Sequence, residues 1–268
     1  MNQHIHQARQ LNAIIPAENR VPRCSVEDFF ATHYDQSPKI PCVIEGLFAA
    51  PSWNRESLRS RLGEVIHTFR YEERATLQMK LGDYIDAMYP LSPDQTLPRP
   101  PSSTEVIPYA RHVGPLAGDL HGQVDIEQLF PASVIPSMHI RKFLFFGAPE
   151  TKTNCHYDWS HNFSYVVEGI KHVTLLPPSS EFMMNLSQDE RKKMAAGSCY
   201  FFEDPAVGEV LLESYPERFV EHPVFTRCPE LYVSALAPGD AVFFPAYWYH
   251  YFHNISATIS VTIQTELS

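Results

Sequence analysis

The sequence is short of glycine, of basic residues and of long apolar runs. Its 268 residues include 11 glycines against 23 prolines, and 21 basic against 31 acidic side chains, for a formal net charge of −10. The acidic balance disfavours a nucleic-acid partner held on a broad basic surface. No stretch approaches the roughly 18 apolar residues of a membrane span. Residues 1–10 are polar and lack the apolar run of a signal peptide, which predicts a cytoplasmic protein.

Cysteine is also sparse, and its arrangement excludes two common scaffolds. The five cysteines are an odd number, they are widely spaced, and none belongs to a CxxC motif; they are Cys24, Cys42, Cys155, Cys199 and Cys228. This pattern predicts reduced thiols rather than a disulfide framework or a zinc ribbon. The hydrophobic content of 44% excludes wholesale disorder and is typical of a globular protein.

The first part of the chain predicts a mixture of helices and strands. Capping signals at Ser25–Asp28 and at Asn54 each indicate the start of a helix. We expect a short buried strand over residues 40–46 and helices over residues 54–62 and 81–89. Residues 90–108 contain six prolines and little periodicity, and are expected to form a surface loop.

The pattern changes to strands from Met138 onward. Short runs rich in β-branched and aromatic residues lie between glycines and prolines, at 143–146, 163–167, 173–176, 241–244 and 258–263. Such runs predict an antiparallel sandwich or barrel. We therefore expect one domain over residues 1–268, mainly β with flanking helices. In it an N-terminal α/β buttress of about residues 1–137 supports a core of about 138–268, which carries an insertion at about 179–232.

The most informative motif is His156-Tyr157-Asp158. Residues i and i+2 of a strand point to the same face, so the imidazole and the carboxylate would converge. One further histidine would complete the facial triad of two histidines and one carboxylate, which leaves positions open and suits non-haem Fe(II). Taken alone, the motif is common by chance, and a strand end with two polar side chains is the alternative.

A second motif supports the metal interpretation. The segment Pro238-Gly239-Asp240 predicts a turn and a strand that ends at Pro245, and an aromatic cluster then leads to His250. With this pairing the chain resembles the JmjC/cupin-like (Cupin_8) family of Fe(II)- and 2-oxoglutarate-dependent oxygenases over roughly residues 40–263. The motifs are closest to those of its asparaginyl-hydroxylase branch, the relatives of the factor that inhibits HIF. The resemblance implies a double-stranded β-helix, the jelly-roll core of cupins.

The resemblance also implies roles for individual residues. His156, Asp158 and His250 match the metal ligands and hence the catalytic centre. The matching co-substrate contacts are Thr153, Lys171, Asn162, Tyr109 and Thr262, the last standing where the asparaginyl-hydroxylase branch has an asparagine. A compact ammonium such as Lys171 suits the far carboxylate of the 2-oxoglutarate dianion. Alone, this lysine would be interpreted as a solvated turn residue.

Other side chains near these motifs have competing interpretations. Trp159 and Trp248 are expected at the mouth of the substrate site, with core packing as the alternative for Trp159. His253 competes with His250 as the third ligand, and the Trp-x-His pattern favours His250. His161 would face away from the ligands on a continued strand, and is expected to be an outer-sphere or surface residue.

The implied reaction consumes 2-oxoglutarate, O₂ and a substrate C–H bond, and yields succinate, CO₂ and a hydroxylated product. We expect Fe(II), 2-oxoglutarate and O₂ as cofactors, and an amino-acid residue of a protein, a peptide or a small molecule as substrate. The alternatives are an N-demethylase or a tRNA-base hydroxylase of the same family, another cupin enzyme, or a non-catalytic metal-binding module. Neither the substrate nor the oligomeric state follows from the sequence.

Overall fold

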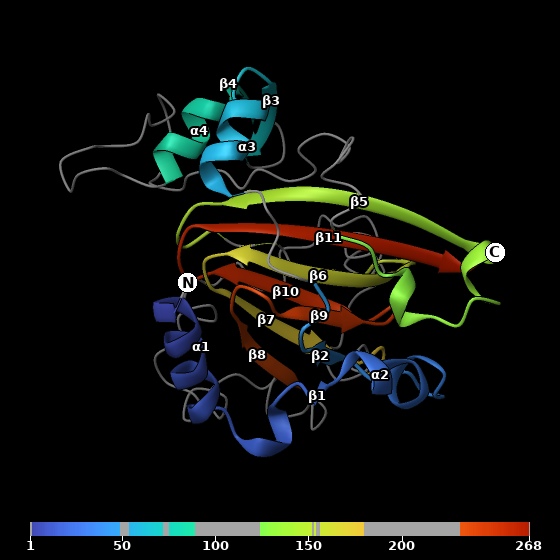
Figure 1. Ribbon diagram of the computed structural model, residues 1–268. Helices are drawn as coiled ribbons and strands as arrows, with labels where there is room; N and C mark the ends of the chain where they lie inside the picture. The colour runs from blue at the N-terminus through green and yellow to red at the C-terminus, as the bar shows by residue number, and fades with distance from the viewer. Residues whose placement is uncertain are drawn as a thin grey trace.

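The β-strands of the protein form two sheets that face each other, together with a separate hairpin (Figure 1). The computed structural model describes residues 2–48, 54–71, 75–88, 124–151, 153, 156–179 and 231–267. The expected loop at 90–108 lies outside the described residues, and so does almost all of the expected insertion, from 180 to 230.

The larger sheet has six strands in the order β1-β2-β9-β6-β11-β5. Its members are β1 (Arg23–Cys24), β2 (Cys42–Ile44), β5 (Met138–Gly147), β6 (His161–Glu168), β9 (Ala241–Phe244) and β11 (Thr258–Leu267). Neighbouring strands are antiparallel except for β1 and β2, which are parallel. Every β run expected after Met138 in this sheet is confirmed. The strand expected over residues 40–46 forms as β2, and β1, which was not expected, extends the sheet at the same edge.

The smaller sheet has three antiparallel strands in the order β10-β7-β8. They are β7 (Lys171–Leu176), β8 (Tyr232–Leu236) and β10 (Tyr249–Asn254), of which only β7 was expected. Gly169 joins β6 to β7 with φ of +85°, and a Cβ there would lie 2.0 Å from the Ala257 carbonyl oxygen. Glycine is therefore required at this turn between the two sheets.

Alternation along the strands separates an interior face from an outer face. One buried cluster draws side chains from both sheets, among them Val166, Val242 and Phe244 from the larger and Val173 and Phe252 from the smaller. Residues on the opposite face of the same sheet, such as Phe163, Phe243 and Val261, belong to a second cluster, on the outer side of the larger sheet. Because side chains alternate with period two, one residue assigned to the interior identifies every second residue of that strand as interior. The expected mainly β, jelly-roll class is confirmed.

Helices and short turns flank the two sheets. The α-helices are α1 (Asn2–Ile14), α2 (Val26–Phe29), α3 (Arg55–Leu62) and α4 (Leu81–Met88). A π-helix η2 (Phe30–Tyr34) continues α2, and 3-10 turns η1 (Ala17–Asn19), η3 (Glu127–Leu129) and η4 (Ile135–Ser137) complete the set. The hairpin of β3 (Ile66–Tyr71) and β4 (Ala75–Lys80) lies with α3 and α4 beyond β5 (Figure 1). Within the described ranges, no helix combines the length and apolar character needed to cross a membrane.

The capping signals of the sequence are confirmed to different extents. The Asn54 side chain accepts from the Ser57 amide, the Ser57 hydroxyl accepts from the Asn54 amide, and the helix ends at Leu62 as expected. The Ser25 hydroxyl accepts from the Asp28 amide, but it donates to the Asp28 carboxylate. That carboxylate therefore binds the hydroxyl instead of the Ser25 amide, and only half of the expected capping box forms.

Helix α1 covers the free edge of the smaller sheet, which the sequence did not reveal. The Asn12 side chain donates to the Ala235 carbonyl and accepts from the Ala235 amide, both at 2.8 Å. One amide side chain thus forms the two backbone hydrogen bonds of Ala235 that a neighbouring strand would otherwise form. This arrangement protects an edge that would otherwise be open to pairing with another chain.

Replacing Phe243 with alanine is expected to lower the free energy of unfolding by about 3–5 kcal/mol, the usual cost of removing a fully buried phenylalanine. The ring lies 5.0 Å from that of Phe29 and 5.1 Å from that of Phe163, between centroids. Urea denaturation measures the loss. As a control, Ile14→Ala at a 54% exposed position is expected to change stability by less than about 1 kcal/mol. Equal effects at the two positions would contradict this account of the core.

Candidate metal centre

Three side chains from separate segments meet at one end of the interior. His156 and His250 form an isolated antiparallel bridge, in which their amides and carbonyls exchange hydrogen bonds of 3.2 and 2.7 Å. Asp158 follows two residues after His156. Ligand atoms of His156, Asp158 and His250 all lie within 4.8 Å of one another. The structure therefore brings together the three residues that the sequence motifs selected.

His250 is set up to act as a neutral ligand. Its Nδ1 lies 3.1 Å from the Trp248 carbonyl oxygen, so an Nδ1–H donates there and Nε2 keeps its lone pair. Metal-binding histidines commonly donate their second ring nitrogen in this way. Burial, with a smaller contribution from the charge of His156, lowers the pKa of His250 to about 3. The ring is consequently unprotonated at neutral pH, as metal ligation requires.

Asp158 is held by both its backbone and its carboxylate. Its Oδ2 lies 3.7 Å from His250 Nε2 and accepts a hydrogen bond of 3.3 Å from Gln264 Nε2. Its carbonyl accepts from the amide of Tyr247 at 2.8 Å. Tyr247 has φ of +67°, a left-handed conformation that is unusual for a bulky residue. The turn between β9 and β10 thus fixes the backbone of Asp158, and β11 orients its side chain.

Gln264→Ala is expected to weaken Mn²⁺ or Fe²⁺ binding by about tenfold, because it removes the donor that orients Asp158. Titration of the purified chain with Mn²⁺, followed by electron paramagnetic resonance, measures the affinity directly. The control is Gln78→Ala, at an exposed position on the β3–β4 hairpin, which is expected to leave the affinity unchanged. Unchanged affinity in Gln264→Ala would mean that the glutamine has no positioning role.

Lys171 lies inside the molecule rather than in a solvated turn. Its side chain is 2% exposed, and its Nζ donates to Ser260 Oγ on β11 at 3.0 Å. The ammonium also lies 4.5 Å from the ring centroid of Phe252 and 5.6 Å from that of Phe145. A positive charge therefore stands between the two sheets, among aromatic faces that attract cations.

Polar atoms without partners lie on the same interior face. Asn162 Nδ2 donates to the Ser160 carbonyl at 3.0 Å, but Asn162 Oδ1 and the Ser164 hydroxyl have no hydrogen-bond partner among the described residues. Both side chains are almost fully buried. Unsatisfied buried polar groups are costly, and they are expected where a polar ligand completes the set. The interior is thus suited to a polar ligand beside the metal ligands.

The remaining expected co-substrate contacts fall in different places. Thr153 is buried, and its Oγ1 accepts from the Phe252 amide at 2.9 Å, so its hydroxyl hydrogen remains available for donation. Thr262 is half-buried and shares the interior face of β11 with Ser260. Tyr109 lies outside the described residues.

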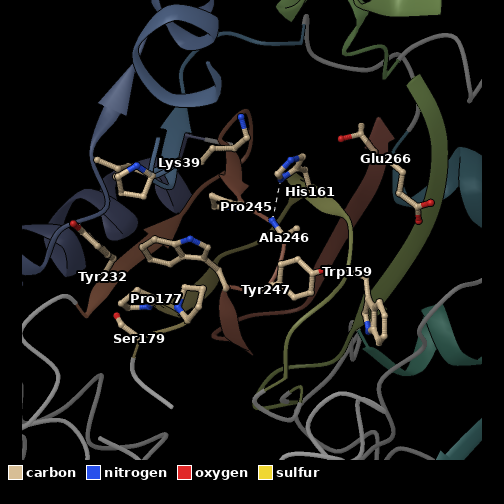
Figure 2. Close-up of a pocket in the computed structure, with 15 residues that line it drawn as sticks. Lys39, Trp159, His161, Pro177, Ser179, Tyr232, Pro245, Ala246, Tyr247 and Glu266 are labelled. Atoms are coloured by element: carbon tan, nitrogen blue, oxygen red, sulfur yellow. Dashed lines mark hydrogen bonds between the residues drawn. The ribbon is translucent and has the colours of Figure 1, made fainter. Parts of the chain in front are cut away.

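A surface pocket of about 990 Å³ is lined by Trp159, which follows Asp158 in the chain, and by Tyr247, whose amide donates to the Asp158 carbonyl (Figure 2). Trp159 and Trp248, the expected residues of the substrate mouth, both line it; the first is 68% exposed and the second is mostly buried. None of the three candidate ligands contributes to its wall. The Trp159 ring lies 6.4 Å from that of Tyr247, between centroids, so the two aromatic rings form part of the same wall. Lys39, His161 and Glu266 provide polar groups in the same wall.

The other histidines have structural surroundings. His161 Nδ1 accepts from the Ala246 amide at 2.9 Å, and burial together with nearby Lys39 lowers its pKa to about 4 (Figure 2). His253 is buried, and its Nε2 lies 2.9 Å from Glu150 Oε2. Burial, with His253 nearby, lowers the pKa of His172 to about 3. Among the described residues, none of these three joins the group of His156, Asp158 and His250.

Three polar residues of the interior were not predicted from the sequence. Ser164, Ser260 and Gln264 had no motif to mark them. A signal was nevertheless present, because Ser260, Thr262 and Gln264 occupy alternate positions between Ile259, Val261 and Ile263. A strand with apolar residues on one face and uncharged polar residues on the other indicates a polar interior, once both faces are known to be covered.

The donor set fits a divalent metal with open positions. Two imidazoles and one carboxylate are the ligands of the facial triad. Three ligands leave coordination positions open, unlike a closed site of four ligands. The hydrogen bond from His250 to Trp248 and that from Gln264 to Asp158 orient two of the three ligands. The buried cation Lys171 and the unsatisfied polar atoms of Asn162 and Ser164, which lie on the same interior face, fit an anionic ligand.

Comparisons with known proteins identify the family of the chain. Residues 27–264 match the family model of the cupin-like domain (Cupin_8). The chain is similar to JmjC domain-containing protein A of Dictyostelium discoideum, 32% identical over 121 residues, which are 44% of this chain and 41% of that protein. JmjC domain-containing protein F of the same organism is 27% identical over 135 residues, 46% and 26% of the two chains. Both alignments span less than half of the relative. Because the family model covers most of its length, the chain belongs to the cupin-like domain family.

Proposed function

We propose that the protein is an Fe(II)- and 2-oxoglutarate-dependent oxygenase that hydroxylates an amino-acid residue, a peptide or a small molecule. The observation that carries the proposal is the convergence of His156, Asp158 and His250 within 4.8 Å on the same interior as a buried lysine. Membership of the cupin-like domain family, which includes such oxygenases, supports it. Bound iron and 2-oxoglutarate would supply the oxidising chemistry, converting a substrate C–H bond to an alcohol with release of succinate and CO₂.

The residues of the chain have separate tasks in this proposal. His156, Asp158 and His250 would hold the metal, with two neutral ligands and one negative charge. Lys171 would neutralise the far carboxylate of 2-oxoglutarate, and Ser260, already bonded to Lys171, would hold the ammonium in place. Aromatic and aliphatic side chains of the interior, including Phe252, would exclude water and so strengthen this ion pair.

We assign the chain to the asparaginyl-hydroxylase branch within this proposal. The spacing of Thr153, Asn162 and Lys171 from His156 resembles the spacing in this branch, and all three side chains are buried. The unsatisfied Asn162 Oδ1 supports a ligand-binding role for that side chain. The surface pocket, whose wall includes Trp159 and Tyr247, has room for an amino-acid side chain or a small molecule.

Succinate formation tests the proposal. The metal-free chain is loaded anaerobically with Fe(II) and 2-oxoglutarate, exposed to O₂, and assayed for succinate with a panel of amino acids and peptides. Succinate above the no-enzyme control, and its stimulation by a substrate, would support the oxygenase. Absence of succinate, together with absence of the visible charge-transfer band of an Fe(II)–2-oxoglutarate chelate, would favour another cupin enzyme or a metal-binding module.

A further inference from the structure

A second group of metal-binding side chains lies away from the triad, where the N-terminal segment packs on the larger sheet. Ligand atoms of Cys24, His33 and Cys42 lie within 4.8 Å of one another, and the two sulfur atoms are 3.4 Å apart. The residues are nine and eighteen positions apart in the chain. This spacing matches no zinc motif, so the group could not be predicted from the sequence.

Pairing of β1 with β2 brings the two thiols to one face. Cys24 lies opposite Ile44 in the parallel ladder, and Cys42 is two residues before Ile44 on the same strand. Residues i and i+2 share a face, so both sulfur atoms point to the outer side of the sheet. Cys42 and Ile44 indeed belong to the outer cluster, and Cys24 packs against it. The π-helix η2, which carries His33, supplies the third ligand.

The register disfavours a disulfide between these cysteines. An offset of two residues is about 6.6 Å along the strands, and neighbouring strands are about 4.8 Å apart. The resulting Cα separation is about 8 Å, beyond the roughly 7 Å that a disulfide spans without backbone movement. A metal ion bridges thiolates without requiring the two sulfur atoms to bond.

His33 has the hydrogen bond expected of a metal-binding histidine. Its Nδ1 lies 3.2 Å from the Ile40 carbonyl oxygen, so an Nδ1–H can donate there and Nε2 keeps its lone pair. A backbone carbonyl is a common partner for the second nitrogen of a ligating imidazole. Cys42 is fully buried, whereas Cys24 and His33 are half-buried, which leaves a path for an ion from solvent.

We propose that Cys24, His33 and Cys42 bind a thiophilic divalent cation of the zinc class. Two thiolates and one imidazole are soft and borderline ligands, unlike the nitrogen and oxygen set of the triad, so the two sites would select different metals. Both thiols release their protons on binding, and water or another ligand takes the fourth position. The ion would tie segment 33–40 to the sheet. Because Lys39 and Ile40 line the outer pocket, the metal would stabilise one wall of that pocket.

Cobalt titration of the full-length chain, reduced and freed of metal, tests the proposal. A thiolate ligand gives Co²⁺ an intense near-ultraviolet charge-transfer band, which the triad cannot give because it contains no sulfur. We expect the band to saturate, at one equivalent in Asp158→Ala, where the triad no longer competes for the ion, and to disappear on addition of Zn²⁺. Cys24→Ser is expected to abolish it, and His33→Ala to weaken binding by at least about tenfold. The matched controls, His6→Ala and Asp158→Ala, are expected to keep it.

A second measurement on the unmutated chain guards against a folding defect in the variants. Zn²⁺ is expected to slow alkylation of Cys24 by at least tenfold, as mapped by mass spectrometry of peptides, with Cys228 as the reference thiol. Absence of the cobalt band in the unmutated chain would overturn the proposal. So would a band of full strength in Cys24→Ser, or a Cys24–Cys42 disulfide in protein prepared without reductant. None of these results depends on the oxygenase activity.

Discussion

Asp158→Ala is expected to lower succinate formation by more than about 100-fold, because it removes the one anionic ligand of the candidate metal centre. Imidazole binds a metal ion in its neutral form, and burial lowers the pKa of His250 to about 3. The histidines that remain in this variant therefore supply no charge to balance a divalent ion. Metal binding, measured by Mn²⁺ titration, is expected to fall together with succinate formation in this variant.

Two controls separate loss of a ligand from general damage. Asp158→Asn keeps the size of the side chain and loses its charge, so it is expected to retain the fold and to bind metal less tightly than the unmutated chain. Asp83→Ala, at an exposed position of α4, is expected to leave both activity and metal binding unchanged. Full succinate formation in Asp158→Ala would rule out the assigned metal site.

Lys171→Met is expected to raise the KM for 2-oxoglutarate by about 10- to 150-fold, with a smaller change in kcat. A hydrogen bond to a charged group contributes about 1.5–3 kcal/mol, and each 1.4 kcal/mol is a factor of ten in affinity. The far carboxylate of the co-substrate would lose its cation, while the metal ligands would be unchanged. Methionine fills a similar volume among Phe145 and Phe252, so the interior is expected to stay packed.

The control for this variant is a second buried lysine. Lys142 lies on β5, on the same face as Leu144 and Phe146, which belong to the outer cluster, so it faces away from the interior. Lys142→Met is expected to leave the KM for 2-oxoglutarate unchanged. An unaltered KM in Lys171→Met would remove the dianion site and favour a cupin enzyme that needs no 2-oxoglutarate.

The candidate site shows how far sequence reasoning extends. His156 and Asp158 could be chosen because their spacing of two places them on one face, and His250 because a turn, a strand and an aromatic cluster lead to it. These relations join residues that are close in the sequence, so they can be found without the structure. The convergence of His250 on the other two depends on pairing between residues 94 positions apart, and only the bridge between His156 and His250 supplies it.

The same division holds for the fold. The β runs after Met138 and the helices over 55–62 and 81–88 were predictable, because alternation, helix caps and prolines act over a few residues. Strands β8 and β10 were missed. Strand β10 is buried throughout its length and has no alternation to reveal it, since both of its faces are covered. Helix α1 was missed too, because its polar sequence is stabilised by contacts with β8 rather than by its own pattern.

The sequence by itself determined the β class of the core, the residue types of the metal centre and the helix starts at Ser25 and Asn54. Tertiary structure alone decided which polar side chains share the interior, because this depends on strand register between distant segments. Ser260 meets Lys171 across the two sheets, and Gln264 meets Asp158 across 106 positions. The grouping of Cys24, His33 and Cys42 has the same origin, since it follows from the register of two short parallel strands and the helix packed on them.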